Sequence, residues 1–124
     1  MRSLDYILLA VRDPLASGAL YRKILGAEPV EASPGFVMFV TANGSKLGLW
    51  LAPEVEPKAK PAGGMEISFT EPDKSALLAT HEAWKAAGLA ILQEPTDMDF
   101  GFTFTAEDPD GHRLRPFVPA DRPA

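Results

Sequence analysis

The strongest constraint on this chain is an internal repeat. A short strand pattern at residues 6–9 recurs at residues 66–69, and each is followed by an acidic residue beside a proline, Asp13-Pro14 and then Pro72-Asp73. A helical pattern follows in both passes, and a glycine ends it, at Gly26 and at Gly88. Each pass alone is too short to bury both of its faces, so we expect two modules that share one structure.

Each pass predicts a strand, a helix and three further strands, which is an α+β arrangement. In the first pass, Asn43-Gly44 gives the hairpin signal between the last two strands, and Asp110-Gly111 holds the same place in the second. The sequence therefore predicts one domain over residues 1–124. It would contain module one (1–52), a Pro-rich linker (53–62), module two (63–119) and a frayed tail (120–124).

The second helical pattern separates core residues from surface residues. Its apolar arc includes Leu77 and Trp84, so we expect Trp84 in the core between helix and sheet. His81 falls just beyond the edge of this arc, and His112 follows a turn, so both are predicted to be partly exposed polar residues. Position 85 is Lys, which excludes a His-Glu-x-x-His zinc motif.

Composition excludes several classes of function. The 124 residues contain no cysteine, which rules out disulfides and thiolate chemistry, and 46% hydrophobic residues suffice for a core. Residues 1–5 lead directly into a strand pattern, and no apolar run approaches the ~20 residues of a membrane span, so a soluble, cytoplasmic protein is expected. The net charge of -5 argues against nucleic acid and favours a cationic or neutral ligand.

The repeat is not equal in length in its two passes. The second has additional residues between its helix and its hairpin turn, at positions 93–101, and they are predicted to form a loop. Loops beside a binding site often determine specificity, so Met98 and Phe100 are candidate ligand contacts. The same two residues suit a contact with a partner subunit equally well.

Two local motifs, together with the repeat, resemble a known family. Tyr21 followed by Leu25-Gly26, and Asp108-Pro109-Asp110-Gly111 before the last strand, are similar to the vicinal oxygen chelate superfamily, the glyoxalase, bleomycin-resistance and extradiol dioxygenase group. Residues 46–50 and 95–101 look most like its small phenazine- and bleomycin-resistance members. The resemblance implies tandem βαβββ modules that form a curved mixed sheet, with a concave ligand pocket and helices on the outer face.

The same resemblance defines where a metal would bind. Enzymes of this superfamily hold a divalent ion with His or Glu from the first and fourth strands of each module, which correspond here to Tyr6, Gly48, Glu66 and Arg115. Only Glu66 is a good ligand, whereas a catalytic ion needs about three. No metal or other cofactor is therefore expected.

Strand alternation predicts which side chains would line the pocket. Residues two apart share a face, which groups Tyr6 with Leu8, Gly48 with Trp50, Glu66 with Ser68, and Arg115 with Phe117. Gly48 would leave room for a ring beside Trp50. The candidate ligand-binding residues are Tyr6, Gly48, Trp50, Glu66, Ser68, Met98, Phe100, Arg115 and Phe117.

Several interpretations of this pocket remain open. Aromatic walls with one acid and one base suit a small planar aromatic ligand, bound without turnover, as in antibiotic sequestration. Alternatively, Trp50 and Phe117 fill a vestigial cavity while Glu66 and Arg115 neutralise each other. A third interpretation is a glyoxalase- or dioxygenase-like enzyme, with displaced metal ligands or with Glu66 as a general base, which requires Glu66 and Arg115 to be kept apart. The resemblance also implies a homodimer.

Overall fold

The structure, a computed structural model, describes residues 1–120. The chain divides into two compact units, Met1–Lys60 and a second unit that begins at Pro61, and the division falls within the Pro-rich segment. These units are called the first and the second module below, and each is described by itself. The predicted frayed tail lies outside the described residues from position 121 on, and the Ala120 amide still donates a 2.9 Å hydrogen bond to the Phe100 carbonyl oxygen.

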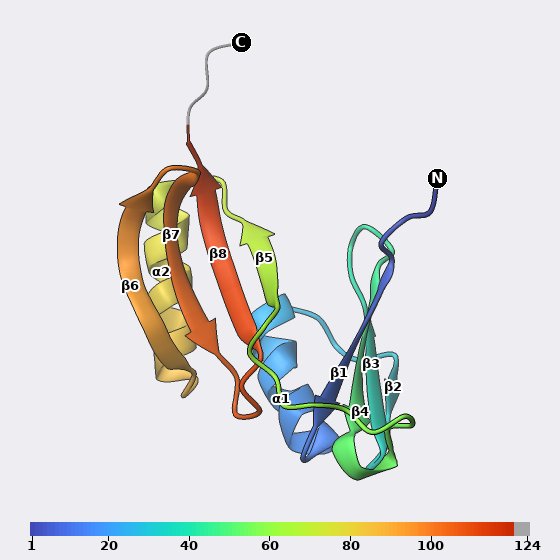
Figure 1. The fold of residues 1–124 in the computed structure, drawn as a ribbon. Helices are drawn as coiled ribbons and strands as arrows, with labels where there is room; N and C mark the ends of the chain where they lie inside the picture. The colour runs from blue at the N-terminus through green and yellow to red at the C-terminus, as the bar shows by residue number, and fades with distance from the viewer. Residues whose placement is uncertain (121–124) are drawn as a thin grey trace. The chain divides into compact units, whose positions relative to one another are not determined.

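The first module consists of one helix and a mixed four-stranded sheet (Figure 1). The strand order is β1-β4-β3-β2, with β1 parallel to β4 and the remaining pairs antiparallel. Its elements are β1 (Tyr6–Val11), α1 (Pro14–Leu25), β2 (Glu31–Ala32), β3 (Phe36–Val40), β4 (Lys46–Leu51) and the 3-10 helix η1 (Ala52–Glu54).

Local sequence signals define the ends of α1 as predicted. The Asp13 side chain caps the helix by accepting a 3.1 Å hydrogen bond from the Ala16 amide. Pro14 occupies the first turn, where its missing N–H is not needed, and Gly26 ends the helix in the left-handed conformation at φ 66°. The helix packs against β3 and β4 and buries one face of the sheet.

Side chains of the first sheet alternate between two environments. Leu9, Val37 and Leu49 are buried on the face that α1 covers. Residues of the other parity, such as Tyr6 and Leu8, are 45% and 52% exposed. We call the face of each sheet that lies opposite the helix of its own module the open face.

The second module repeats this plan with its own mixed four-stranded sheet, of order β5-β8-β7-β6, so the tandem α+β prediction is confirmed. Strand β5 is parallel to β8, and the other two pairs are antiparallel. Figure 1 shows α2 lying along one face of this sheet. The elements are β5 (Glu66–Thr70), α2 (Lys74–Ala86), β6 (Ala90–Met98), β7 (Gly101–Glu107) and β8 (Arg113–Pro119).

An aromatic cluster joins α2 to its sheet. Trp84 is 5% exposed, as predicted for a core residue. Its ring meets Phe69 and Phe104 edge to face, at centroid distances of 5.8 Å and 5.5 Å. Such contacts add about 0.5–1.5 kcal/mol each to the burial of the rings, so this cluster fixes the position of the helix on the sheet.

His81 corrects a prediction, because it is buried, at 6% exposure, rather than partly exposed. Leu77, His81 and Trp84 are spaced by four and three residues, so they form a single stripe along α2 that faces the sheet. The His81 ring packs edge to face on Phe104 at 5.1 Å. Its Nε2 lies 2.9 Å from Glu94 Oε2, although the two atoms are not aligned as a hydrogen bond.

The predicted loop at residues 93–101 is also wrong, because most of it belongs to β6. This nine-residue strand runs as far as Met98, and only Asp99 and Phe100 connect it to β7. The strand lies at the edge of its sheet and shifts register on both sides of Gln93. An edge strand tolerates Pro95 because one side of its backbone needs no ladder partner.

Both predicted glycine turns are present. The Gly44 amide donates to the Thr41 carbonyl oxygen at 2.9 Å, and the Gly111 amide donates to the Asp108 carbonyl oxygen at 3.0 Å. Both glycines have a positive φ, 85° and 88°, which a residue with a side chain adopts only at a cost. Asp108 also accepts from the amides of Asp110 and His112, so it organises the second turn.

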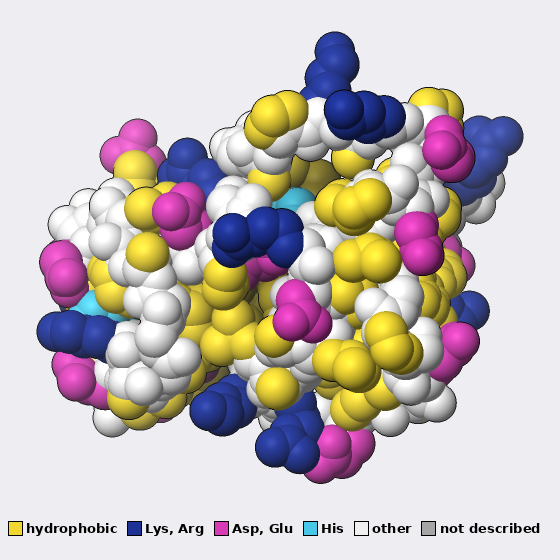
Figure 2. Space-filling model, turned by 90° about the horizontal axis from the view of Figure 1, so that it is seen from below, with side chains coloured by type: hydrophobic (Ala, Val, Ile, Leu, Met, Phe, Trp, Pro, Cys, Tyr) yellow, Lys and Arg dark blue, Asp and Glu magenta, His cyan; other side chains and the backbone are white. Residues whose placement is uncertain are grey.

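Within residues 1–120, no helix is long and apolar enough to cross a membrane. The side of the molecule drawn in Figure 2 has acidic and basic side chains interspersed among hydrophobic ones, without a large patch of one charge.

Candidate functional site

The open face of the second sheet carries a cluster of polar and aromatic side chains. Strand alternation places Glu66 and Ser68 of β5 on this face, together with Arg113, Arg115 and Phe117 of β8. The two strands are paired so that Ser68 lies directly opposite Arg115 and Glu66 opposite Arg113. Glu66 is therefore the diagonal neighbour of Arg115, within reach of a long side chain.

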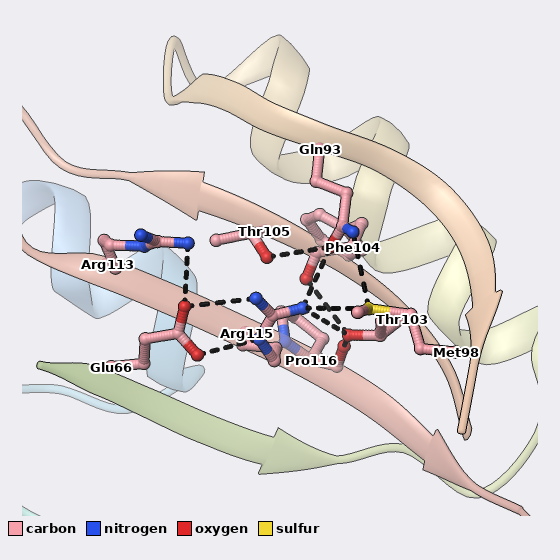
Figure 3. Close-up of polar contacts among 9 residues, drawn as sticks. All are labelled: Glu66, Gln93, Met98, Thr103, Phe104, Thr105, Arg113, Arg115 and Pro116. Atoms are coloured by element: carbon pink, nitrogen blue, oxygen red, sulfur yellow. Dashed lines mark hydrogen bonds and ion pairs between the residues drawn. The ribbon is translucent and has the colours of Figure 1, made fainter. Parts of the chain in front are cut away.

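Arg115 and Glu66 form a bidentate ion pair (Figure 3). Arg115 Nε donates to Glu66 Oε1 at 2.8 Å, and Arg115 Nη2 donates to Glu66 Oε2 at 3.1 Å. The Arg115 side chain is 14% exposed and that of Glu66 is 30% exposed. Arg113 Nη2 also contacts Glu66 Oε2 at 2.9 Å, so two guanidinium groups share one carboxylate.

The third nitrogen of the Arg115 guanidinium faces strands β6 and β7. Nη1 donates to Gln93 Oε1 at 2.9 Å and lies 3.5 Å from Thr103 Oγ1. Thr105 donates to the same Gln93 oxygen at 3.2 Å, and Thr103 donates to the Pro116 carbonyl oxygen at 2.7 Å. Figure 3 shows Arg115 held between Glu66 on one side and Gln93 on the other.

Aromatic rings and a thioether lie beside this polar network. The Phe100 ring centroid is 5.7 Å from Arg115 Cζ, and Phe100 meets Phe117 edge to face at 6.0 Å. Met98 Sδ accepts a 3.4 Å contact from Gln93 Nε2, and the Met98 side chain is 42% exposed. The predicted residues Glu66, Met98, Phe100, Arg115 and Phe117 therefore lie in one cluster on this module.

The ion pair determines the protonation state of Glu66. The hydrogen bond from Arg115 lowers the pKa of the Glu66 carboxyl below its ordinary value of 4.5, burial raises it, and the charges of Arg115 and Arg113 lower it further. Glu66 is therefore a carboxylate at neutral pH with both oxygens occupied. A general base with these properties would be weak, and the separation of Glu66 from Arg115 that such a role requires is not observed.

The four positions that correspond to family metal ligands do not fit a divalent ion. Both Glu66 oxygens are bound by guanidinium groups, and Arg115 carries the charge that repels a cation. Gly48 has no donor side chain, and the Tyr6 hydroxyl points to Met38 Sδ at 3.3 Å. Among residues 1–120, His, Cys, Asp and Glu side chains form no group of three or more that could hold a metal.

Ser68 shares the open face of the second sheet, and the other three predicted residues, Tyr6, Gly48 and Trp50, lie on the open face of the first sheet. Trp50 is half-buried there, and Tyr6 lies beside Lys46, whose Nζ is 5.7 Å from the ring centroid. Gly48 corrects a prediction, because the space above it is already filled. A Cβ atom at this position would lie 2.7 Å from Leu8 Cδ2 and 2.8 Å from Phe36 Cζ, so Gly48 accommodates side chains of its own module rather than a ligand ring.

The sequence analysis missed four members of the polar network: Gln93, Thr103, Thr105 and Arg113. Arg113 could have been found, because it lies two residues before Arg115 and so shares its face. Gln93 could not, since the register shifts of β6 on either side of it break the alternation on which face assignment depends.

Comparisons with known proteins agree with this fold. Residues 3–115 match the model of the family described as Glyoxalase/Bleomycin resistance protein/Dioxygenase superfamily. The chain is 31% identical over 111 residues to the phenazine antibiotic resistance protein EhpR of Enterobacter agglomerans, covering 87% of this chain and 85% of that protein.

Two solved structures are similar over nearly the whole chain. The solution NMR structure of protein ATC0852 from Agrobacterium tumefaciens is 48% identical, with a TM-score of 0.89 and coverage of 98% of this chain and 100% of that one. A glyoxalase-related enzyme from Fulvimarina pelagi is 23% identical, with a TM-score of 0.85 and coverage of 95% and 88%. At 23% identity the second likeness supports the fold alone.

Proposed function

The chain belongs to the glyoxalase/bleomycin resistance protein/dioxygenase superfamily, and we propose that it binds a small planar aromatic molecule without converting it. The observation that carries this proposal is the guanidinium of Arg115, which protein contacts hold in place beside the rings of Phe100 and Phe117. A fixed planar cation next to aromatic edges is a surface on which a flat ring can stack. The open face of the second sheet is the proposed binding surface.

The relative EhpR supports the choice of ligand class. It is named for resistance to phenazine antibiotics, and phenazine is a flat, fused aromatic ring system. Met98 adds a flexible, polarizable side chain that adapts to rings of different outline. Sequestration of a toxic aromatic compound is the role that such binding would serve in this protein.

Binding without turnover is favoured by the chemistry of the charged groups. Glu66 has a lowered pKa, and both of its oxygens accept hydrogen bonds from a guanidinium group, which leaves it poorly suited to remove a proton from a ligand. The same contacts make Glu66 a poor metal ligand. The charged groups of this face are therefore suited to holding each other and a ligand in position.

A direct test measures the affinity of the purified protein for phenazine and a panel of planar aromatics, first by thermal shift and then by calorimetry. Phe117→Ala should weaken binding by about 1–3 kcal/mol, the range for loss of one aromatic stacking surface. Leu78→Ala is the matched control, because Leu78 is 45% exposed on α2, on the helix side of the same module. No binding of any panel member, or equal binding by Phe117→Ala and Leu78→Ala, would refute the proposal.

Trp50 tests the contribution of the first module separately. It remains our prediction that Trp50 contacts the ligand, so binding should quench its fluorescence and Trp50→Ala should lose about 1–3 kcal/mol of affinity. A folded Trp50→Ala variant that binds every ligand as well as the wild type would restrict the site to the second module.

A further inference from the structure

The hydrogen-bonding capacity of Arg115 is used almost completely by the protein itself. All three guanidinium nitrogens donate to protein acceptors: Nε and Nη2 to Glu66, and Nη1 to Gln93. A free arginine recognises carboxylates through this same edge, by paired N–H donors. Since the edge is occupied, a ligand could approach Arg115 only at the flat face of the guanidinium. The Arg115 side chain is 14% exposed, and the Phe100 ring centroid lies 5.7 Å from its Cζ, so a ligand at that face would also meet Phe100.

We propose that the ligands of this protein are planar aromatic molecules without a negative charge, which stack on the face of the Arg115 guanidinium while Glu66 keeps its edge closed to anions. This inference rests on the proposed function and goes beyond it by defining the charge of the ligand. Glu66 is then a specificity-determining residue, because its carboxylate occupies the position that a ligand carboxylate would otherwise take. An anionic ligand would also meet the negative charge of Glu66 nearby.

Arg113 is the alternative anion receptor on this face, and its surroundings argue against that role. Its Nη2 contacts Glu66 Oε2 at 2.9 Å, and its Nε is buried, where a ligand cannot reach it without rearrangement. On the neighbouring strand β7, Glu107 lies directly opposite Arg113 in the ladder and has the same face parity. Glu66 therefore pairs directly with Arg113, and Glu107 places a second carboxylate residue opposite it on the strand at its other side.

The net charge of the whole chain also disfavours anionic ligands. Its net charge is -5, so the chain as a whole repels anions over distance. Long-range electrostatics therefore favour neutral or cationic ligands. At close range, the Glu66–Arg115 pair is what distinguishes anionic from uncharged ligands.

The test compares two ligands of equal size that differ in one charge, phenazine-2-carboxamide and phenazine-2-carboxylate. Wild-type protein should bind the carboxamide at least as tightly as the carboxylate, and its affinity for the carboxamide should change less than about threefold between roughly 0.01 M and 1 M salt. Tenfold tighter binding of the carboxylate would overturn the charge preference while leaving the proposed function intact. Failure of both phenazines and of every other planar aromatic to bind would instead overturn the proposed function itself.

A substitution then tests the role of Glu66. Glu66→Gln removes the negative charge and leaves one oxygen acceptor in place of two, so one Arg115 N–H loses its partner. Affinity for the carboxylate should then rise about tenfold or more relative to the carboxamide, as expected for a new charge-assisted contact. Glu107→Gln is the control, because it removes one negative charge from the same face beside Arg113. An equal shift in both variants, or none in a folded Glu66→Gln, would refute the specific role of Glu66. The wild-type comparison stands even if Glu66→Gln does not fold.

Discussion

The Glu66–Arg115 pair should be strongly coupled in stability, and a double-mutant cycle can measure this. The variants are Glu66→Gln, Arg115→Met and the double substitution, each unfolded in urea and followed by circular dichroism. Two hydrogen bonds between charged groups, at 2.8 Å and 3.1 Å, join the side chains. Hydrogen bonds to charged groups contribute about 1.5–3 kcal/mol each when well shielded from water.

Two features of the structure reduce this magnitude. Glu66 is 30% exposed, so solvent screens part of the attraction, and Arg113 shares the carboxylate and compensates in part for the loss of Arg115. We therefore expect a coupling free energy of about 1–2 kcal/mol, well above the ~0.5 kcal/mol within which independent substitutions add.

The Arg22–Glu28 pair provides the matched control. These side chains are 52% and 73% exposed and meet through a single 3.2 Å contact, so their coupling should stay below about 0.5 kcal/mol. If the Glu66–Arg115 coupling were no larger than that of Arg22–Glu28, the pair would not hold the guanidinium in place, and the stacking surface inferred from it would lose its support.

Three further results are expected. The pKa of Glu66 is lowered by Arg115, so the stability that ionised Glu66 contributes is complete above about pH 4.5 and is lost as the pH falls through the folded-state pKa. The difference in unfolding free energy between wild type and Glu66→Gln, measured in urea, should therefore shrink below about pH 4.5. A difference that stays constant with pH would contradict this. Trp84→Ala should destabilise the fold by about 3–5 kcal/mol, because the Trp84 ring is 5% exposed and packs on two other rings. Trp50→Ala should lower the free energy of unfolding by less, because Trp50 is only half-buried. Equal losses would contradict the assignment of Trp84 to the core. We also expect a homodimer, as the family resemblance implies, and sedimentation showing only monomer at micromolar concentration would count against it.

The parts of the fold that the sequence predicted are those fixed by local chemistry. Asp13 and Pro14 favour a helix start through their own side chains, and Gly26 ends the helix by adopting a conformation that other residues avoid. The turn at Gly111 follows from the same kind of local preference. These signals recur in both modules, so the repeat could be recognised before any tertiary contact was known.

The pairing of Glu66 with Arg115 needed information that alternation does not contain. Alternation correctly assigned both residues to one face of the sheet, but it leaves open whether they meet or stay apart. The answer depends on the register between β5 and β8, in which Ser68 is opposite Arg115 and Glu66 is one diagonal step away. Register is set by packing across the whole sheet, and so both interpretations remained compatible with the sequence.

Space at Gly48 was misjudged for a similar reason. A glycine on a strand signals a close approach, and the sequence alone does not identify what approaches. The side chains of Leu8 and Phe36 come from the two strands that flank β4, and they close over the glycine. A ligand would have to displace them before it could reach the backbone there.

The different roles of Arg113 and Arg115 follow from their neighbours on β7. The two arginines share a strand and a face, so strand alternation alone does not distinguish their roles. Arg115 extends towards small threonine side chains, passes Thr103 and reaches Gln93 on the strand beyond, which engages its last nitrogen. Arg113 has Glu107 opposite it instead, a larger and charged neighbour. Arg115 is thereby fixed between acceptors on strands to either side of it, and a guanidinium fixed in this way is better suited to recognise the face of a flat ring than the charge at its edge.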